Sequence, residues 1–136
     1  MTDNNYGKDL AFYKLERAKD EIESAELLFD HCKYKAANNR AYYAIYYTLT
    51  AVLCLEPISF KKHKDTIAYF NKNYVHKGLF SNELGRKISK AEKIRNASDY
   101  NDFYIAGKED ASGQIETAKE VVQAVEIFLN KHTDDY

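Results

Sequence analysis

The sequence predicts an all-α protein: an antiparallel bundle of four to five helices that forms a single domain over residues 1–136. Apolar residues return every three or four positions along five stretches, the spacing that places them on one face of a helix. The 136 residues include only one proline and five glycines, which argues against the many tight turns of a β-sandwich or barrel. We place the core at about residues 8–131, followed by a short frayed tail.

The first two predicted helices form a long pair. The first runs from Lys8 to about Cys32, with Leu15 and Ile22 on its apolar face. The second runs from about Tyr34 to Leu55. It carries a ridge of small residues: Ala37, Ala41, Ala44, Thr48 and Ala51. Because the distance between packed helices depends on the side chains at their contact, this ridge predicts close approach by a neighbour.

Three more helices follow. Pro57 ends the second helix, because proline has no backbone N–H and a fixed φ. The third helix spans roughly His63–Val75, and Ser81 is the expected N-cap of the fourth. The fourth ends near Tyr100, and the last spans about Glu109–Lys131 with a regular apolar stripe.

The net charge of −1 hides a basic middle segment. Residues 59–95 contain ten Lys and Arg against three Asp and Glu, whereas residues 96–136 contain three against nine. This segment fits a nucleic-acid binder if its basic residues gather on one face. The alternative is that they only solvate two surface helices.

Familiar enzyme signatures are missing. The sequence has no glycine-rich phosphate loop, no HExxH and no spaced Cys/His quartet, so we predict neither a metal nor a cofactor. The two cysteines, Cys32 and Cys54, form no CxxC pair. No apolar run reaches the roughly 18 residues of a membrane span, and the N-terminus lacks a signal-peptide core. We therefore expect a cytoplasmic protein without membrane contact.

The second helix is rich in tyrosine. Arg40, Tyr43 and Tyr47 share one face, and Tyr42 and Tyr46 share another. Tyrosines with apolar bodies and hydroxyl tips suit a groove or a subunit interface, although aromatic residues at helical spacing also pack in cores. We expect surface left over for a partner, and hence a homodimer.

The end of the fourth helix is the second unusual segment. Arg95 and Asp99 lie one turn apart on one face, as do Asn96 and Tyr100. The pattern is compatible with an ion pair before a helix stop. It is equally compatible with a guanidinium among polar neighbours that holds a phosphate.

Four blocks together resemble the HEPN superfamily, and most of all its small stand-alone bacterial and archaeal members. They are RAYYAIYY at 40–47, Lys62-His63-Lys64, Lys77-Gly78-Leu79 and the run from Arg95 to Tyr100. The resemblance covers residues 8–130 and implies a four- or five-helix bundle that dimerises around a cleft. Many members are encoded beside a minimal nucleotidyltransferase in toxin–antitoxin pairs, and the competent ones are metal-independent endoribonucleases.

The resemblance assigns roles to the end of the fourth helix. Arg95 matches the family's arginine and Asn96 the polar residue after it, whereas Tyr100 stands where a histidine is expected. A phenol, with an ordinary pKa of about 10, is a poor general base at neutral pH, so this departure puts catalysis in doubt. In the toxin branch the partner modifies with AMP a tyrosine two residues beyond the histidine. Asp102 stands at that position here and Tyr104 lies two residues further on, so Tyr100 and Tyr104 are the candidates for modification.

Four further residues complete the predicted nucleotide- or RNA-binding site: Arg40, Tyr43, His63 and Asp99. For Arg40 the alternative is a surface ion pair. His63 either supplies the missing proton chemistry, or caps the third helix or joins a basic surface patch.

Three functions remain open at this point. The first is a HEPN protein that binds nucleotide or RNA in a dimer cleft and acts with a nucleotidyltransferase. The second is an active metal-independent endoribonuclease toxin. The third is an interaction module without a ligand.

Overall fold

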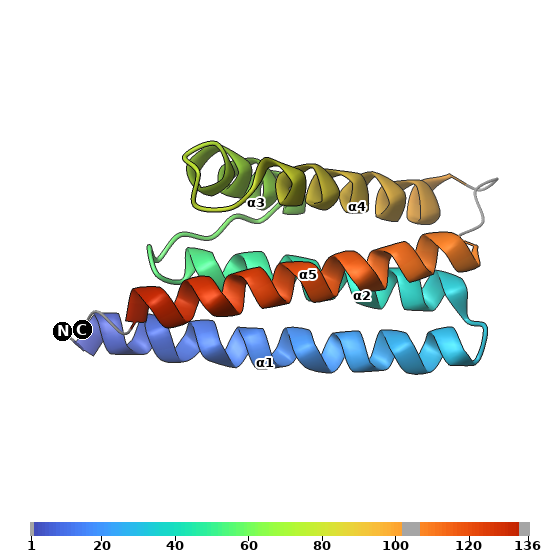
Figure 1. The fold of residues 1–136 in the computed structure, drawn as a ribbon, viewed down its shortest axis with the longest axis horizontal. Coiled ribbons are helices and arrows are strands. Elements are labelled where there is room, and N and C mark those ends of the chain that lie inside the picture. The colour runs from blue at the N-terminus through green and yellow to red at the C-terminus, as the bar shows by residue number, and fades with distance from the viewer. Residues whose placement is uncertain (1, 102–106, 134–136) are drawn as a thin grey trace.

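The structure is a computed structural model that describes residues 2–101 and 107–133, and all its regular elements there are helical. They are α1 (Thr2–Asp30), α2 (Tyr34–Leu53), α3 (His63–Phe70), a π-helical turn η1 (Asn71–Val75), α4 (Asn82–Tyr100) and α5 (Lys108–Thr133). The long helices α1, α2 and α5 lie side by side, and α3 and α4 form a second layer over them (Figure 1). The predicted all-α bundle is confirmed.

The small-residue ridge of α2 forms the centre of the core. All five of its predicted residues are buried, and α1 packs on α2 with the buried Ala11, Leu15 and Ala18. Alanines on both helices let the two backbones approach closely along their length. Larger side chains beside the ridge, such as Ile45 and Leu49, supply the apolar area that stabilises the contact.

Several predicted helix ends differ from the structure. α1 ends at Asp30 where about Cys32 was expected, and α5 continues to Thr133, beyond about Lys131. α1 begins at Thr2, ahead of the predicted Lys8, and so runs through Gly7. A Cβ on Gly7 would lie 2.9 Å from the carbonyl oxygen of Cys54, so the missing side chain lets α1 continue over the end of α2. The second helix ends at Leu53, two residues before the predicted Leu55, and irregular turns follow.

The predicted third helix changes character along its length. Its last turn, η1, is a π-helix, in which the N–H of His76 donates to the carbonyl oxygen of Asn71 at 2.9 Å. The wider turn lies against Gly85 of α4, where a Cβ would be only 2.9 Å from Val75 Cγ1. A π-turn inserts one extra residue into a helix, and apolar periodicity did not reveal it.

An aromatic cluster fastens α3 and η1 to the bundle. Phe70 and Phe80 have ring centroids 5.0 Å apart, and Phe128 of α5 lies 5.0 Å from Phe80. The ring of Tyr74 joins the same cluster, and its hydroxyl donates to Glu56 in the connection after α2. This cluster fixes the third helix relative to α5.

The fourth helix starts as predicted. The Oγ of Ser81 accepts a hydrogen bond from the N–H of Leu84 at 3.1 Å, which confirms the N-cap. Farther along, Lys87 lies 2.7 Å from Glu120 of α5 and 3.5 Å from Glu83. The pair with Glu120 holds one side of α4 toward α5, whereas the pair with Glu83 lies within α4.

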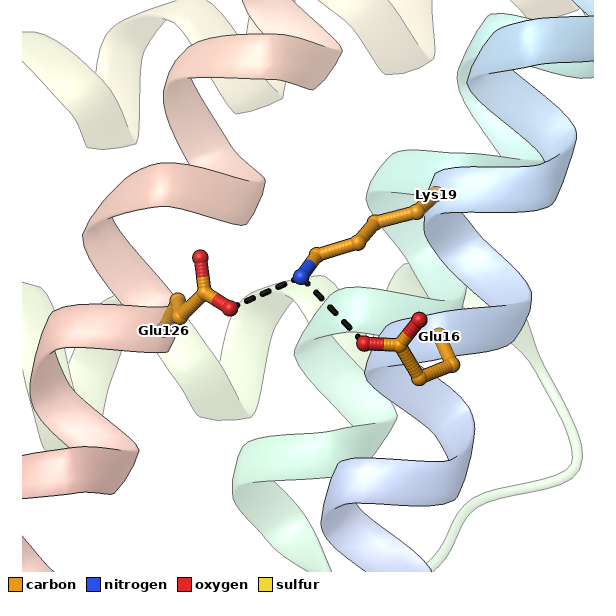
Figure 2. Close-up of polar contacts among 3 residues, drawn as sticks. All are labelled: Glu16, Lys19 and Glu126. Atoms are coloured by element: carbon orange, nitrogen blue, oxygen red, sulfur yellow. Dashed lines mark hydrogen bonds and ion pairs between the residues drawn. The ribbon is translucent and has the colours of Figure 1, made fainter.

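A similar bridge joins α1 to α5. The Nζ of Lys19 lies 2.7 Å from a carboxylate oxygen of Glu126 and 3.3 Å from one of Glu16. Both contacts are drawn in Figure 2. The hydrogen bond to Glu126 raises the pKa of Lys19 above its ordinary value. Partly exposed ion pairs of this kind contribute at most about 1 kcal/mol each to the stability of the fold. Burial of the apolar stripes therefore contributes most of the stability of the helix packing.

Candidate functional site

Arg95 lies in the last turns of α4 and faces the tyrosines of α2. Its guanidinium carbon is 5.3 Å from the ring centroid of Tyr42 and 5.9 Å from that of Tyr43. Its Nε is 2.9 Å from Oδ2 of Asp99. Among the described residues the Nε–H has no hydrogen-bond partner, so the contact with Asp99 is an ion pair. With 16% of its side chain exposed, Arg95 is a positioned cation near the surface.

His63, the first residue of α3, enters the same group of tyrosines. Its ring stacks on Tyr46 with centroids 3.8 Å apart, and its Nδ1 lies 3.3 Å from the hydroxyl of Tyr42. Its ring also meets Tyr43 edge-on, at 6.0 Å between centroids. Arg95 and His63 therefore share Tyr42 and Tyr43 as neighbours, although they come from different helices.

Tyr42 links the two. It is buried, and burial, followed by the charge of Glu92, raises the pKa of its phenol well above the ordinary value. The hydroxyl therefore stays protonated at neutral pH. When it donates to Nδ1 of His63, the remaining proton of a neutral imidazole sits on Nε2.

The environment of His63 predicts its titration. Burial, and then the positive charge of Arg95, lowers the pKa of His63 below its ordinary 6.5. A neutral His63 thus stabilises the fold above about pH 6.5, and this contribution is lost as the pH falls toward the lowered pKa. We expect an NMR titration of its ring to show a midpoint below 6.5 that moves upward in Arg95→Gln. An unchanged midpoint in the variant would contradict the proximity of the two side chains.

The other predicted site residues are placed differently. The guanidinium of Arg40 lies 3.4 Å from Glu21 of α1, which matches the surface ion-pair alternative. Asn96 is exposed, and Tyr100 is 75% exposed at the end of α4. Tyr104 lies outside the residues that the structure describes. The structure thus brings Tyr43, His63, Asp99 and Arg95 together.

Three neighbours of this group were not predicted as site residues. Tyr42 and Tyr46 hold His63, and Glu92 lies one turn before Arg95 on α4. Burial raises the pKa of the Glu92 carboxyl, while the charges of Arg95 and Lys64 act against that rise. The i, i+3 spacing of Glu92 and Arg95 was the available signal in the sequence.

A large cavity lies elsewhere. It measures about 1140 Å³, and its lining includes the start of α1, the end of α2 and the connection after it. Its lining is mainly apolar and does not include Arg95 or His63, although it reaches Tyr46. Cavity volume therefore does not identify the candidate site. The group of Arg95, His63 and their tyrosines is the candidate because of its chemistry.

The described part of the chain lacks two features, a cluster of metal ligands and a membrane-spanning helix. Residues 2–101 and 107–133 hold no group of three His, Cys, Asp or Glu side chains arranged to bind a metal. In those same ranges, no helix has the length and apolar character to cross a membrane.

Comparison with known proteins agrees with the resemblance. Residues 13–128 match the HEPN domain family. The chain is 31% identical to a "UPF0332 protein" of Thermotoga maritima, over 86% of this chain and 89% of the relative. Two proteins of Methanocaldococcus jannaschii are each named "putative toxin". One is 34% identical over 63% of this chain and 64% of the relative. The other is 30% identical over 86% of this chain and 75% of the relative. Since the family match spans most of its length, the chain belongs to the HEPN domain family.

Proposed function

We propose that this chain is a toxin-like HEPN protein that binds RNA through a phosphate held by Arg95. The carrying observation is the placement of the Arg95 guanidinium, partly buried against Tyr42 and Tyr43 and beside His63. A guanidinium offers paired N–H donors that match phosphate oxygens, and tyrosine rings provide faces on which bases stack. The names of the two archaeal relatives support the toxin-like role.

The proposal extends to the assembly. We take the working form to be a homodimer with the Arg95 surface in its cleft, acting with a minimal nucleotidyltransferase. Support comes from Tyr100, which is 75% exposed at the end of α4, five residues after Arg95, since a large apolar ring with a hydroxyl tip is typical of interfaces. Sedimentation at micromolar concentration tests the dimer, and a monomer would remove the shared cleft.

The binding experiment uses a fluorescein-labelled single-stranded RNA. We expect its anisotropy to rise on addition of the protein in EDTA, and the affinity to fall as salt increases, because phosphate contacts release counterions. A free nucleotide such as ATP serves as competitor. Strong competition by ATP would make the ligand a nucleotide, and no binding of either would overturn the proposal.

One observation favours a second function, an endoribonuclease. His63 and Arg95 flank the same tyrosines, so an imidazole lies near the cation although Tyr100 replaces the expected histidine. In such a reaction the 2′-hydroxyl attacks the adjacent phosphorus and the bond to the 5′-oxygen breaks. A base takes the 2′ proton, an acid protonates the leaving oxygen, and the arginine stabilises the developing charge.

Cleavage is tested with the same RNA, run on a denaturing gel after incubation in EDTA. If His63 supplies the proton chemistry, wild type cuts the RNA and His63→Asn loses about a hundredfold or more in rate. Tyr100→Phe is the matched variant and should retain the activity. If the protein binds the RNA but leaves it intact, the nuclease hypothesis is rejected and the binding function is kept.

A further inference from the structure

A second basic feature lies between η1 and α4. It is a shallow hollow of about 440 Å³ whose rim carries Arg86, Lys90 and Lys93 of α4. Of the described residues that line it, none is acidic and none is a large exposed apolar residue. The basic middle segment of the sequence therefore does concentrate part of its charge at one place.

The shape of the hollow follows from the packing of η1 on α4. Gly85 has no side chain, which lets Val75 approach and leaves a depression beside α4. On its floor, Nδ2 of Asn71 donates to Oγ of Ser89 at 3.2 Å. The Oδ1 of Asn71 is buried and has no hydrogen-bond partner among the described residues. The floor is therefore polar and fixed.

Arg86, Lys90 and Lys93 are free to bind an anion. They fall at i, i+4 and i+7, so they follow one side of α4 over roughly 10 Å. All three are exposed, and none forms an ion pair within the described ranges. Lys87, on the neighbouring side of the same helix, is by contrast held by Glu83 and Glu120.

We propose that this basic hollow binds the phosphate backbone of single-stranded RNA, as an anchor separate from Arg95. The inference rests on the proposed RNA-binding function. A row of cations fits a chain of phosphates better than a single ion, and such contacts position an RNA without reading its sequence. A membrane-binding surface would need apolar side chains beside the cations, and the hollow exposes none of the large ones.

The position of the hollow sets the path of the RNA. Lys93 and Arg95 are two residues apart, about 200° around the axis of α4. Arg95 faces α2, so the hollow lies on the other side of the helix. An RNA that reaches both must pass around α4, and a strand too short to do so gains nothing from the hollow.

The test is a hollow variant with Arg86→Gln, Lys90→Gln and Lys93→Gln. We measure anisotropy with labelled single-stranded RNA of four and of sixteen nucleotides, from 50 to 300 mM KCl. For the long RNA we expect about tenfold or greater loss of affinity at low salt. The slope of log K against log salt should become shallower by about two, because each phosphate contact on a single strand contributes about 0.7. The short RNA should be affected much less.

A control variant removes the same charge elsewhere: Lys14→Gln, Lys33→Gln and Lys35→Gln on α1 and at the start of α2. It should keep the wild-type slope, and circular dichroism checks that both variants are folded. If the slope of log K against log salt is the same in the two variants, the proposed role of the hollow is rejected and the proposed function is unaffected. Loss in the hollow variant alone, with Arg95→Gln unchanged, would overturn the role of Arg95 and keep the hollow. Wild type that binds phosphatidylserine vesicles but no RNA would overturn both.

Discussion

Replacing Arg95 with glutamine should lower the affinity for single-stranded RNA about tenfold to a hundredfold. Hydrogen bonds to charged groups contribute roughly 1.5–3 kcal/mol, and about 1.4 kcal/mol corresponds to a factor of ten. Arg95 fits this range because its guanidinium is already positioned against Tyr42 and Tyr43. Little side-chain entropy is then lost when a phosphate binds.

The matched control is Arg17→Gln. The Arg17 guanidinium lies 5.4 Å from the ring centroid of Tyr47, so it is also an arginine stacked on a tyrosine of α2. It is an exposed residue of α1, however, and its ring partner Tyr47 is not one of the two rings that flank Arg95. We expect Arg17→Gln to reduce affinity less than twofold at 150 mM salt. Equal losses in the two variants would mean that only overall charge matters and that Arg95 holds no phosphate.

The fold could be predicted because its signals are local. The apolar stripe of α1, the small-residue ridge of α2 and the N-cap at Ser81 each depend on residues within a few turns of one another. The predictions were wrong where contacts between segments distant in the sequence determine the local structure. α1 extends through Gly7 because that glycine meets the carbonyl of Cys54, and the π-turn at Asn71–Val75 packs against Gly85.

The candidate site was predictable only in part, for the same reason. The spacing of Arg95 and Asp99 on one helix placed that pair correctly. The stacking of His63 on Tyr46 depends on the path of the connection between α2 and α3, which no periodicity encodes. Arg40 shares a helix face with Tyr43 in the sequence pattern, yet its charge is directed to Glu21 of α1.

Phe70→Ala should have the largest effect on stability. The Phe70 ring is fully buried between Tyr74 and Phe80, and truncating a buried phenylalanine costs about 3–5 kcal/mol. For a domain of this size we expect the melting temperature to fall by about 10 °C or more. The same aromatic cluster fixes α3, whose first residue is His63. The variant should therefore also loosen the stacking of His63 on Tyr46.

Calorimetry measures the first effect, and the NMR signal of the His63 ring reports the second. Leu79→Ala is the control, because Leu79 is an apolar residue of the neighbouring turn that is 49% exposed; it should change the melting temperature by only about 2 °C. If Phe70→Ala shifts the His63 signal toward that of an exposed histidine while Leu79→Ala does not, the aromatic cluster is what positions the candidate site. A large drop in melting temperature with the His63 signal unchanged would mean that the tyrosines of α2 hold the imidazole without help from the packing of α3.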